Sequence, residues 1–314
     1  MAKKPAKQLE ILSVIDTLSG HYLQGKIRAL RLAMIALLAD GHLLLEDIPG
    51  LGKTTLALAL SKALGLSFGR IQCTSDLLPS DITGLSIFDR DQSNFRFIKG
   101  PIFNHILLVD EINRAMPKTQ SALLEAMEER KVTIEGTSYI LPQPFIVIAT
   151  QNPLEQIGTY PLPESQLDRF LITTDIGYPP PKLEKEIISG GGIRNKMSDI
   201  QPLLTLDDIE EAKQAVHNIQ LDDKLVDYIL TISQASRSHE FVAAGISTRG
   251  AISMAVAARA AAYLDGRHYV IPEDVKLIAG PVAAHRLILK PEYQSLNNRE
   301  VLVSILDNVP VPMV

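Results

Sequence analysis

A lysine and a threonine follow a glycine-rich turn in the stretch Leu43–Thr55, LLLEDIPGLGKTT. Glycines let backbone N–H groups approach a triphosphate, and the first turn of a following helix offers unpaired N–H groups and a positive dipole end. In such a loop the lysine reaches the β- and γ-phosphates and the threonine hydroxyl binds Mg²⁺. We therefore predict a phosphate-binding loop formed by Pro49, Gly50, Leu51, Gly52, Lys53, Thr54 and Thr55.

One position departs from the usual pattern of such loops, G-x-x-x-x-G-K-[ST]. Asp47 stands where the pattern has its first glycine, five residues before Gly52. The alternative interpretation is an ordinary glycine turn between a strand and a helix. Other polar residues along the chain decide between these two interpretations.

Two acidic residues, Asp110 and Glu111, come directly after the apolar run Ile106–Val109. An aspartate at the end of a strand can hold Mg²⁺ and its water shell beside a phosphate loop. A glutamate one residue later can polarise the water that attacks the γ-phosphorus. A solvated turn is the alternative, but the apolar strand and the preceding phosphate loop favour the catalytic interpretation.

An asparagine, Asn152, follows another apolar run, Phe145–Ala149. A neutral amide at the end of a strand can orient the attacking water or contact the γ-phosphate. Asparagine also suits a turn before a proline, and Pro153 follows, so a turn residue is the alternative interpretation.

Two arginines complete the set of candidate site residues. Arg169 precedes an expected strand, and an arginine supplied across a subunit interface stabilises charge that develops on the transferred phosphoryl group. A surface salt bridge with Asp168 or Glu164 is the alternative. Arg249 lies near the start of an expected helix in the second half, from which it is predicted to reach the γ-phosphate.

Short apolar strands that alternate with helices predict a parallel sheet covered on both faces. In such sheets, ligands bind beyond the carboxyl ends of the strands, where Lys53, Asp110, Glu111 and Asn152 are all expected. The expected strands are Leu43–Leu45, Arg70–Cys73, Ile106–Val109, Phe145–Ala149 and Leu171–Ile176. The expected helices of this part are Ala6–Leu18, Ile27–Leu38 and Pro117–Arg130.

Two hairpins are predicted within this part of the chain. Leu85–Phe88 and Phe95–Ile98 flank one polar turn, and Val132–Ile134 and Tyr139–Leu141 flank another. The side chains of Phe88, Phe95 and Phe97 either face a partner or pack against the main domain.

A proline-rich segment, residues 178–182, predicts a linker between two domains. The expected organisation is an α/β nucleotide-binding domain with N-terminal helices at residues 1–177, and a small helical domain at 183–314. The expected helices of the second domain are Leu206–Val216, Asp222–Ala235, Thr248–Leu264 and Pro272–His285.

The composition of the 314-residue chain limits its function further. A hydrophobic content of 46% and a charged content of 21% are typical of a globular protein. The net charge of −5 gives no indication of nucleic-acid binding. Cys73 is the single cysteine, which excludes an intramolecular disulfide and a cysteine metal cluster. Neither a signal peptide nor a membrane-spanning run is apparent, so we expect a cytoplasmic protein without membrane insertion.

Several segments together resemble the MoxR family of AAA+ ATPases. The resemblance covers about Gly25 to Val314, is most specific from Asp110 to Phe170, and is carried by LLLEDIPGLGKT, RIQCTSDLLPSDITG, KGPIF, LLVDEINRAMPKTQSALLEAMEERKVTIEG, FIVIATQNP and GTYPLPESQLDRF. Weaker similarities are STRGA, PVAAHRL and NVPVP. An acidic or other residue often replaces the first glycine in this family, so Asp47 no longer argues against a phosphate loop.

The resemblance implies an α/β P-loop NTPase fold, with an AAA+ parallel-sheet domain and a C-terminal helical lid domain. By position, Lys53 and Thr54 match the Walker A residues and Asp110 and Glu111 the Walker B pair. Asn152 matches sensor 1, Arg169 the arginine finger and Arg249 sensor 2 on the lid. The cofactors implied are ATP and Mg²⁺, with Mg²⁺ held by Thr54 and Asp110. Gly25-Lys26 stands where the family usually has Gly-Gln, which affects only contacts on the adenine side.

The family resemblance also implies a homo-oligomeric ring, a hexamer, in which both hairpins face the pore. Family members resemble chaperones that remodel partner proteins, and the implied partners include a protein with a von Willebrand factor A domain. The alternatives are a nucleic-acid or chelatase-type AAA+ motor subunit, and a nucleotide-switched scaffold with little turnover. Nothing in the sequence identifies the client protein.

Overall fold

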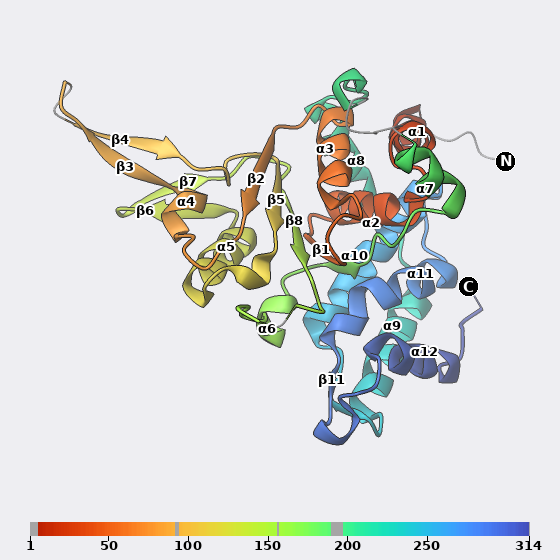
Figure 1. The fold of residues 1–314 in the computed structure, drawn as a ribbon. Coiled ribbons are helices and arrows are strands. Elements are labelled where there is room, and N and C mark those ends of the chain that lie inside the picture. Colours follow the sequence, from red (N-terminus) through yellow and green to blue (C-terminus); the bar gives the residue numbers. More distant parts are fainter. Residues whose placement is uncertain (1–5, 92–93, 156, 190–196, 314) are drawn as a thin grey trace.

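Five strands form a parallel sheet in the order β2-β5-β8-β1-β9 at the centre of the molecule (Figure 1). The computed structural model describes residues 6–91, 94–155, 157–189 and 197–313. The strands are β1 (Leu43–Glu46), β2 (Phe68–Gln72), β5 (Ile106–Asp110), β8 (Ile146–Gln151) and β9 (Ile172–Thr174). All residues of β5 and nearly all of β1 and β8 are buried, as expected for a sheet covered on both faces. The predicted α/β fold is confirmed.

Side chains alternate between the two faces of the sheet, and each face belongs to a different apolar core. Leu43 and Leu45 pack into the larger core, with the N-terminal helices and the helices of the C-terminal part. Leu44 packs on the opposite face with α5. The helices beside the sheet are α1 (Ala6–His21), α2 (Ile27–Leu38), α3 (Lys53–Ala63), α4 (Pro79–Thr83), α5 (Pro117–Glu129) and α6 (Glu164–Leu167). Because α2 also contacts α8 and α10, the sheet and the C-terminal helices share one continuous core.

Both predicted hairpins are present, with β3 (Gly84–Asp89) pairing with β4 (Asn94–Lys99) and β6 (Lys131–Ile134) with β7 (Thr137–Ile140). The first hairpin projects far from the sheet (Figure 1). Its base requires Gly84, because a Cβ there would lie 2.2 Å from the carbonyl oxygen of Ile98.

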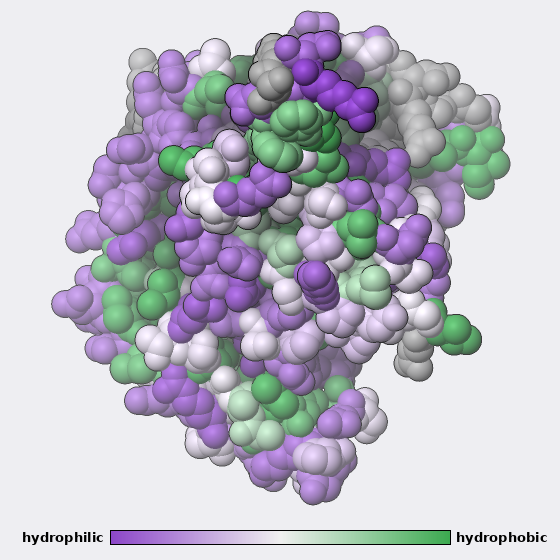
Figure 2. Space-filling view, turned by 90° about the vertical axis from the view of Figure 1, so that its left-hand side faces the viewer, coloured by the Kyte–Doolittle hydropathy of each residue, from purple (hydrophilic) through white to green (hydrophobic). Residues whose placement is uncertain are grey.

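The three aromatic side chains of the first hairpin divide between the two interpretations. Phe97 stacks on Tyr139 of the second hairpin, with ring centroids 4.3 Å apart. Phe88 and Phe95 pair edge-to-face and remain 55% and 62% exposed. Figure 2, which faces the side from which the hairpins project, shows apolar patches separated by hydrophilic residues. The packing interpretation therefore holds for Phe97, while Phe88 and Phe95 stay accessible.

The C-terminal part is helical, as predicted, with three additions. Helix α7 (Pro181–Ile188) begins inside the expected linker, because proline is accepted at the first position of a helix. Helix α12 (Asn298–Asn308) and the small sheet of β10 (Val242–Ala244) and β11 (Ile288–Leu289) were not expected. The four predicted helices are α8 (Leu206–His217), α9 (Asp223–Ser238), α10 (Thr248–Leu264) and α11 (Pro272–Ala283). No helix among the described residues is long and apolar enough to cross a membrane.

Candidate functional site

A polar cavity of about 360 Å³ lies at the carboxyl ends of β1, β5 and β8. Because these strands are parallel neighbours, the loops that follow them meet at the same edge of the sheet. The cavity is lined by Pro49, Gly50, Gly52, Lys53, Thr54, Thr55, Arg70, Gln72, Asp110, Glu111, Thr150 and Asn152. The structure thus brings together the phosphate loop, the acidic pair and Asn152, as the sequence predicted.

The phosphate loop turns directly into α3, whose first residue is Lys53. Gly52, the residue before the helix, has φ of +94°, which favours glycine because it has no Cβ. The Lys53 ammonium donates a hydrogen bond to the main-chain oxygen of Asp47. Burial lowers the pKa of Lys53, while the nearby carboxylates of Asp47, Asp110 and Glu111 oppose this shift. The arrangement places the Lys53 ammonium beside the N–H groups at the start of α3, and a helix start of this kind suits an anion such as a triphosphate.

The acidic pair is held by residues from neighbouring strands. The Asp110 carboxylate accepts a hydrogen bond from Arg70 Nε at 2.8 Å. The Glu111 carboxylate accepts one from Gln72 Nε2 at 2.9 Å. Thr150, on β8, accepts a hydrogen bond from the main-chain N–H of Glu111 at 2.9 Å.

Arg70, Gln72 and Thr150 were missed by the sequence analysis. On β2, exposed Arg70 and Gln72 alternate with buried Gly69 and Ile71. This alternation with a period of two could have indicated that Arg70 and Gln72 lie on the same face of the strand. The strand order that places β2 beside β5 could not be obtained from that pattern.

Two further features of the site follow from its backbone. Glu111 has φ of +56°, an uncommon conformation for a residue with a side chain, and such conformations often occur at functional sites. Asn152 lines the cavity, and its side-chain oxygen accepts a hydrogen bond from Leu154 N at 3.2 Å. Asn152 therefore forms the turn of the alternative interpretation and also lines the cavity, while its contact with the attacking water or the γ-phosphate stays a prediction.

A second, more apolar cavity of about 630 Å³ adjoins the polar one. The two cavities share Pro49, Gly50, Gly52 and Thr55 of the phosphate loop, while Leu51 lines only the apolar cavity. Its other walls include Tyr22, Leu23, Lys26, Ile48, Ile176, Tyr178, Pro179, Glu184 and Ile187. A ligand whose phosphates occupy the polar cavity could thus place an apolar ring system in the adjoining one.

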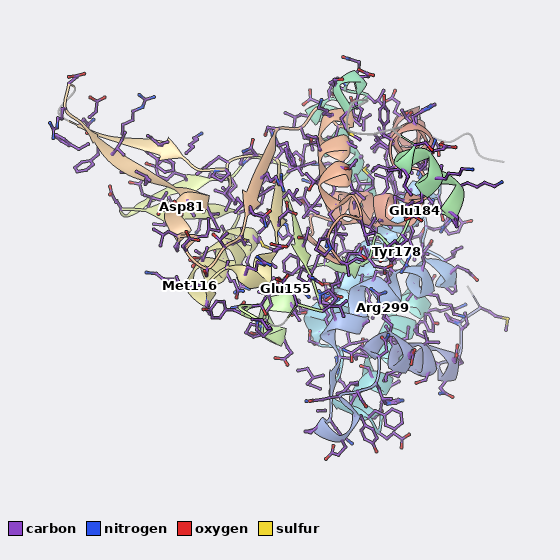
Figure 3. The ribbon with its side chains drawn as sticks, in the orientation of Figure 1. Asp81, Met116, Glu155, Tyr178, Glu184 and Arg299 are labelled. Carbon is purple, nitrogen blue, oxygen red and sulfur yellow. The ribbon has the colours of Figure 1, made fainter. Side chains whose placement is uncertain are left out.

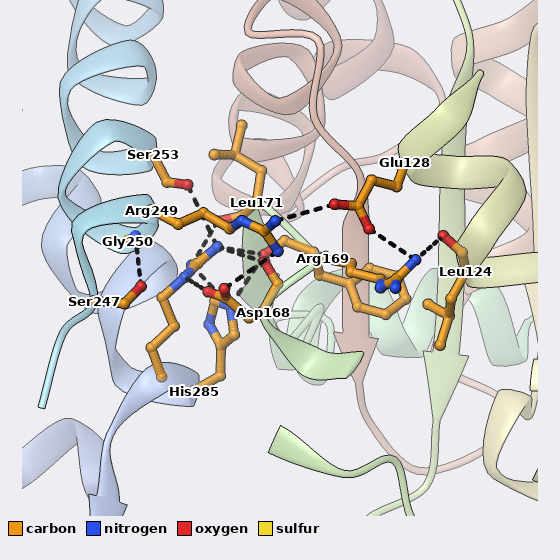
Figure 4. Close-up of polar contacts among 12 residues, drawn as sticks. Leu124, Glu128, Asp168, Arg169, Leu171, Ser247, Arg249, Gly250, Ser253 and His285 are labelled. Atoms are coloured by element: carbon orange, nitrogen blue, oxygen red, sulfur yellow. Dashed lines mark hydrogen bonds and ion pairs between the residues drawn. The ribbon is translucent and has the colours of Figure 1, made fainter. Parts of the chain in front are cut away.

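The two candidate arginines lie together in a third cavity, of about 420 Å³. Glu128, on α5, joins them: its carboxylate lies 2.9 Å from Arg169 Nη1 and 3.0 Å from Arg249 Nη2 (Figure 4). Asp168 lies 3.7 Å from Arg249 Nη1, and it accepts a hydrogen bond from buried Arg286 at 2.6 Å. The alternative interpretation of Arg169, a salt bridge with Asp168 or Glu164, is not observed, since its carboxylate partner is Glu128.

This arginine cavity lies at the opposite edge of the sheet from the phosphate loop. His42 and Leu171 line it, and they directly precede β1 and β9, so it lies at the amino ends of these strands. Neither Arg169 nor Arg249 lines the polar cavity. The packing of α10 thus places Arg249 beside Arg169 and not beside Lys53. The contact of Arg249 with a γ-phosphate stays a prediction.

Comparison with known proteins agrees with this architecture. Residues 42–172 match the family described as "ATPase family associated with various cellular activities (AAA)", and residues 234–305 match the AAA lid domain. A Mycobacterium tuberculosis protein, Chaperone MoxR1, is 40% identical over 90% of this chain and 77% of its own length. This chain belongs to the MoxR family of AAA+ ATPases. The family membership implies ATP hydrolysis, so the chain is an ATPase.

Two more comparisons cover nearly the whole chain. YeaC from Bacillus subtilis is 45% identical over 90% of this chain and 89% of its own length. The crystal structure of a protein from Cytophaga hutchinsonii superposes with a TM-score of 0.90 and 36% identity, covering 98% of this chain and 96% of that one. The predicted AAA+ sheet domain with a C-terminal helical lid is therefore confirmed.

Proposed function

We propose that this MoxR-family ATPase hydrolyses ATP between neighbouring copies in a ring, a hexamer, and uses the energy to remodel partner proteins. The observation that carries the proposal is the separation of Lys53 and Glu111 from Arg169 and Arg249. Strand β1 has four residues, which span roughly 13 Å at the usual rise of a strand. Groups at its opposite ends lie too far apart to contact one phosphate, and this separation supports our proposal that a second copy supplies the arginines.

Each protomer then supplies two sets of groups, one that binds and attacks its own ATP and one that acts on the ATP of its neighbour. Lys53 and the N–H groups of the phosphate loop bind the triphosphate, and Glu111 acts as base for the attacking water. Asn152 orients that water from the end of β8. Arg169 and Arg249, held together by Glu128, enter the neighbouring protomer's site and stabilise the charge that develops on its γ-phosphate.

The residues of the polar cavity fit Mg²⁺. Thr54 and Asp110 both line it and offer oxygen ligands, which this cation prefers. Across the described ranges, no group of three or more His, Cys, Asp or Glu could hold a metal ion alone. This agrees with a cation that takes few protein ligands and shares the phosphates of the nucleotide. When bound there, Mg²⁺ would supply positive charge that offsets the negative charge of the triphosphate.

The proposed role in remodelling rests on two observations of different kinds. The relative from Mycobacterium tuberculosis is named a chaperone. The exposed pair Phe88 and Phe95 at the projecting hairpin offers an apolar surface to a protein client. Through the family resemblance, we include a protein with a von Willebrand factor A domain among the partners.

The experiment measures ATP binding, ATP hydrolysis with and without Mg²⁺, and mass in solution with and without ATP. We expect Lys53→Ala to lose ATP binding, and Glu111→Gln to retain bound ATP without turnover. Lys276→Ala, an exposed lysine on α11, is the matched control and should behave like the parent chain. A parent chain that neither binds ATP nor assembles beyond a monomer would refute the proposal, whereas ATP binding and assembly without turnover would indicate a nucleotide-switched scaffold.

The client is best sought with the Glu111→Gln protein, because trapped ATP should hold the ring and its bound partner together. The Lys53→Ala protein serves as the control, since it should not form the ATP-bound state. Proteins recovered with the first variant and absent from the second are the candidate clients.

A further inference from the structure

Asp47, which replaces the first glycine of the usual phosphate-loop pattern, contacts a segment far away in the sequence. Its Oδ2 accepts hydrogen bonds from the main-chain N–H groups of Ile176 and, at 3.3 Å, Gly177. These two residues follow β9 and lead out of the sheet. A glycine at position 47 could make neither contact.

A second charged side chain holds the same segment from the other side. The ammonium of Lys26 donates a hydrogen bond to the main-chain oxygen of Gly177. Burial lowers the pKa of Lys26, while the charge of Asp47 opposes that shift. The neighbouring Gly25 allows close packing, because a Cβ there would lie 2.5 Å from Cδ of Pro180. The segment 176–180 is thus fixed between the phosphate loop and the loop before α2.

This segment forms one wall of the apolar cavity. Ile176, Tyr178 and Pro179 line it, and α7 adds Glu184 and Ile187. Figure 3 labels Tyr178 and Glu184 close to one another at this part of the molecule. Because the cavity shares four phosphate-loop residues with the polar cavity, it lies where the nucleoside end of a bound ATP would extend.

Asp47 also contacts the catalytic side of the loop. Its main-chain oxygen accepts the hydrogen bond from Lys53 described above. The main-chain oxygen of Asp47 therefore contacts Lys53 at the phosphate end, and its carboxylate contacts the segment that forms the wall of the apolar cavity. These two contacts can be separated experimentally, because a substitution at position 47 removes the carboxylate and leaves the main-chain oxygen in place.

We propose that Asp47 is a positioning residue for the nucleoside of ATP, because its carboxylate holds the 176–179 wall against the phosphate loop. This inference rests on the proposed function, in which the polar cavity binds the triphosphate. It explains why an acidic residue occupies a position where glycine is usual: the carboxylate couples the wall to the loop, and the loop keeps its phosphate contacts through its main chain.

The test compares two ligands that share phosphates and differ in the nucleoside, Mg²⁺-ATP and inorganic tripolyphosphate. We expect Asp47→Gly to weaken ATP binding about tenfold to hundredfold, the effect of losing hydrogen bonds to a charged group. Tripolyphosphate binding should change by less than about twofold, within the uncertainty of such comparisons. Asp47→Asn should fall between the parent and Asp47→Gly, since its amide oxygen still accepts an N–H but without the charge.

Asp47→Asn replaces Asp47→Gly if that protein does not fold. Lys26→Met is a further variant that removes the other hydrogen bond to the same segment and should also weaken ATP binding and spare tripolyphosphate, but Lys26 lines the apolar cavity itself, so the inference is decided by the Asp47 variants. An equal loss of both ligands in Asp47→Gly would mean that Asp47 acts through Lys53, which overturns the inference. Unchanged ATP binding in both Asp47 variants overturns it as well. A parent chain that binds neither ligand would instead remove the proposed function itself.

Discussion

Two variants, each inactive alone, should restore hydrolysis when they are mixed. Arg169→Ala keeps its phosphate loop and Glu111 but offers its neighbour no arginine from position 169. Glu111→Gln lacks the base but still carries both arginines. Because the arginine cavity and the phosphate loop lie at opposite edges of the sheet, the intact halves of these two proteins can meet only between copies.

The structure allows the size of the effect to be estimated. An arginine supplied in trans is worth about 10³ to 10⁵ in turnover, so Arg169→Ala alone should fall to about a thousandth of the parent rate or below. A general base is worth about 10² to 10⁴, so Glu111→Gln alone should fall to about a hundredth or below. In an equal mixture within a closed ring, about one interface in four combines an Arg169→Ala site with an intact arginine from Glu111→Gln. The mixture should therefore recover about one quarter of the parent rate if the interfaces act independently.

The assay is steady-state phosphate release after the two proteins have exchanged subunits, with co-assembly verified by a tag on one variant. The double variant Glu111→Gln/Arg169→Ala is the matched control, because mixing it with Arg169→Ala completes no interface. Recovery with Glu111→Gln and none with the double variant is the expected result. Full hydrolysis by Arg169→Ala alone, or no recovery in rings that contain both variants, would refute the geometric reasoning.

Three further predictions concern stability. Burial lowers the pKa of His42 to about 3, so the unfolded chain binds a proton that the folded chain excludes, and stability is lost as pH falls below about 6.5. Between pH 7.5 and 5.5 the free energy of unfolding should fall by about 1.4 kcal/mol because of His42. His42→Gln should therefore reduce the pH dependence of the free energy of urea unfolding by that amount. An unchanged pH dependence would contradict this prediction. Asp168→Ala leaves the buried Arg286 without its carboxylate partner and should destabilise the fold by about 3 kcal/mol in the same assay, whereas an unchanged midpoint would mean that the pair is not needed. Thr205 caps α8 because its side chain accepts a hydrogen bond from Asp208 N. Thr205→Ala should therefore lower the free energy of unfolding by about 1 kcal/mol, and the control variant Thr205→Ser should lower it by less. Equal losses of stability in the two variants would argue against the cap.

Much of the fold and most residues of the polar cavity could be predicted from the sequence because their signals are local. The strands β1, β5 and β8 are almost wholly buried, and their runs of apolar residues already predict this burial. The glycine turn before Lys53 and the acidic pair after β5 belong to the ends of those runs. Parallel strands align such ends at one edge, so Lys53, Asp110, Glu111 and Asn152 could be expected to meet.

Long-range packing decided what the sequence analysis missed or misplaced. Arg70 and Gln72 reach the acidic pair only because β2 lies next to β5 in the sheet. Arg249 meets Glu128, which also binds Arg169, because of the way α10 packs, and the spacing of residues along the chain does not indicate this contact. The contacts of α7 with the apolar cavity have the same origin, because its residues follow β9 at the edge of the sheet.

The sequence by itself determined the strands, the phosphate loop and the family of this protein, because each depends on residues that are close together in the chain. Only the tertiary structure decided at which edge of the sheet Arg169 and Arg249 lie. It also decided that Asp47 accepts hydrogen bonds from Ile176 and Gly177, which lie 129 and 130 positions further along the chain. These decisions depend on strand order and on the packing of the C-terminal helices against the sheet. Neither is encoded in the spacing of neighbouring residues, since both arise from burial of apolar surface across the whole chain.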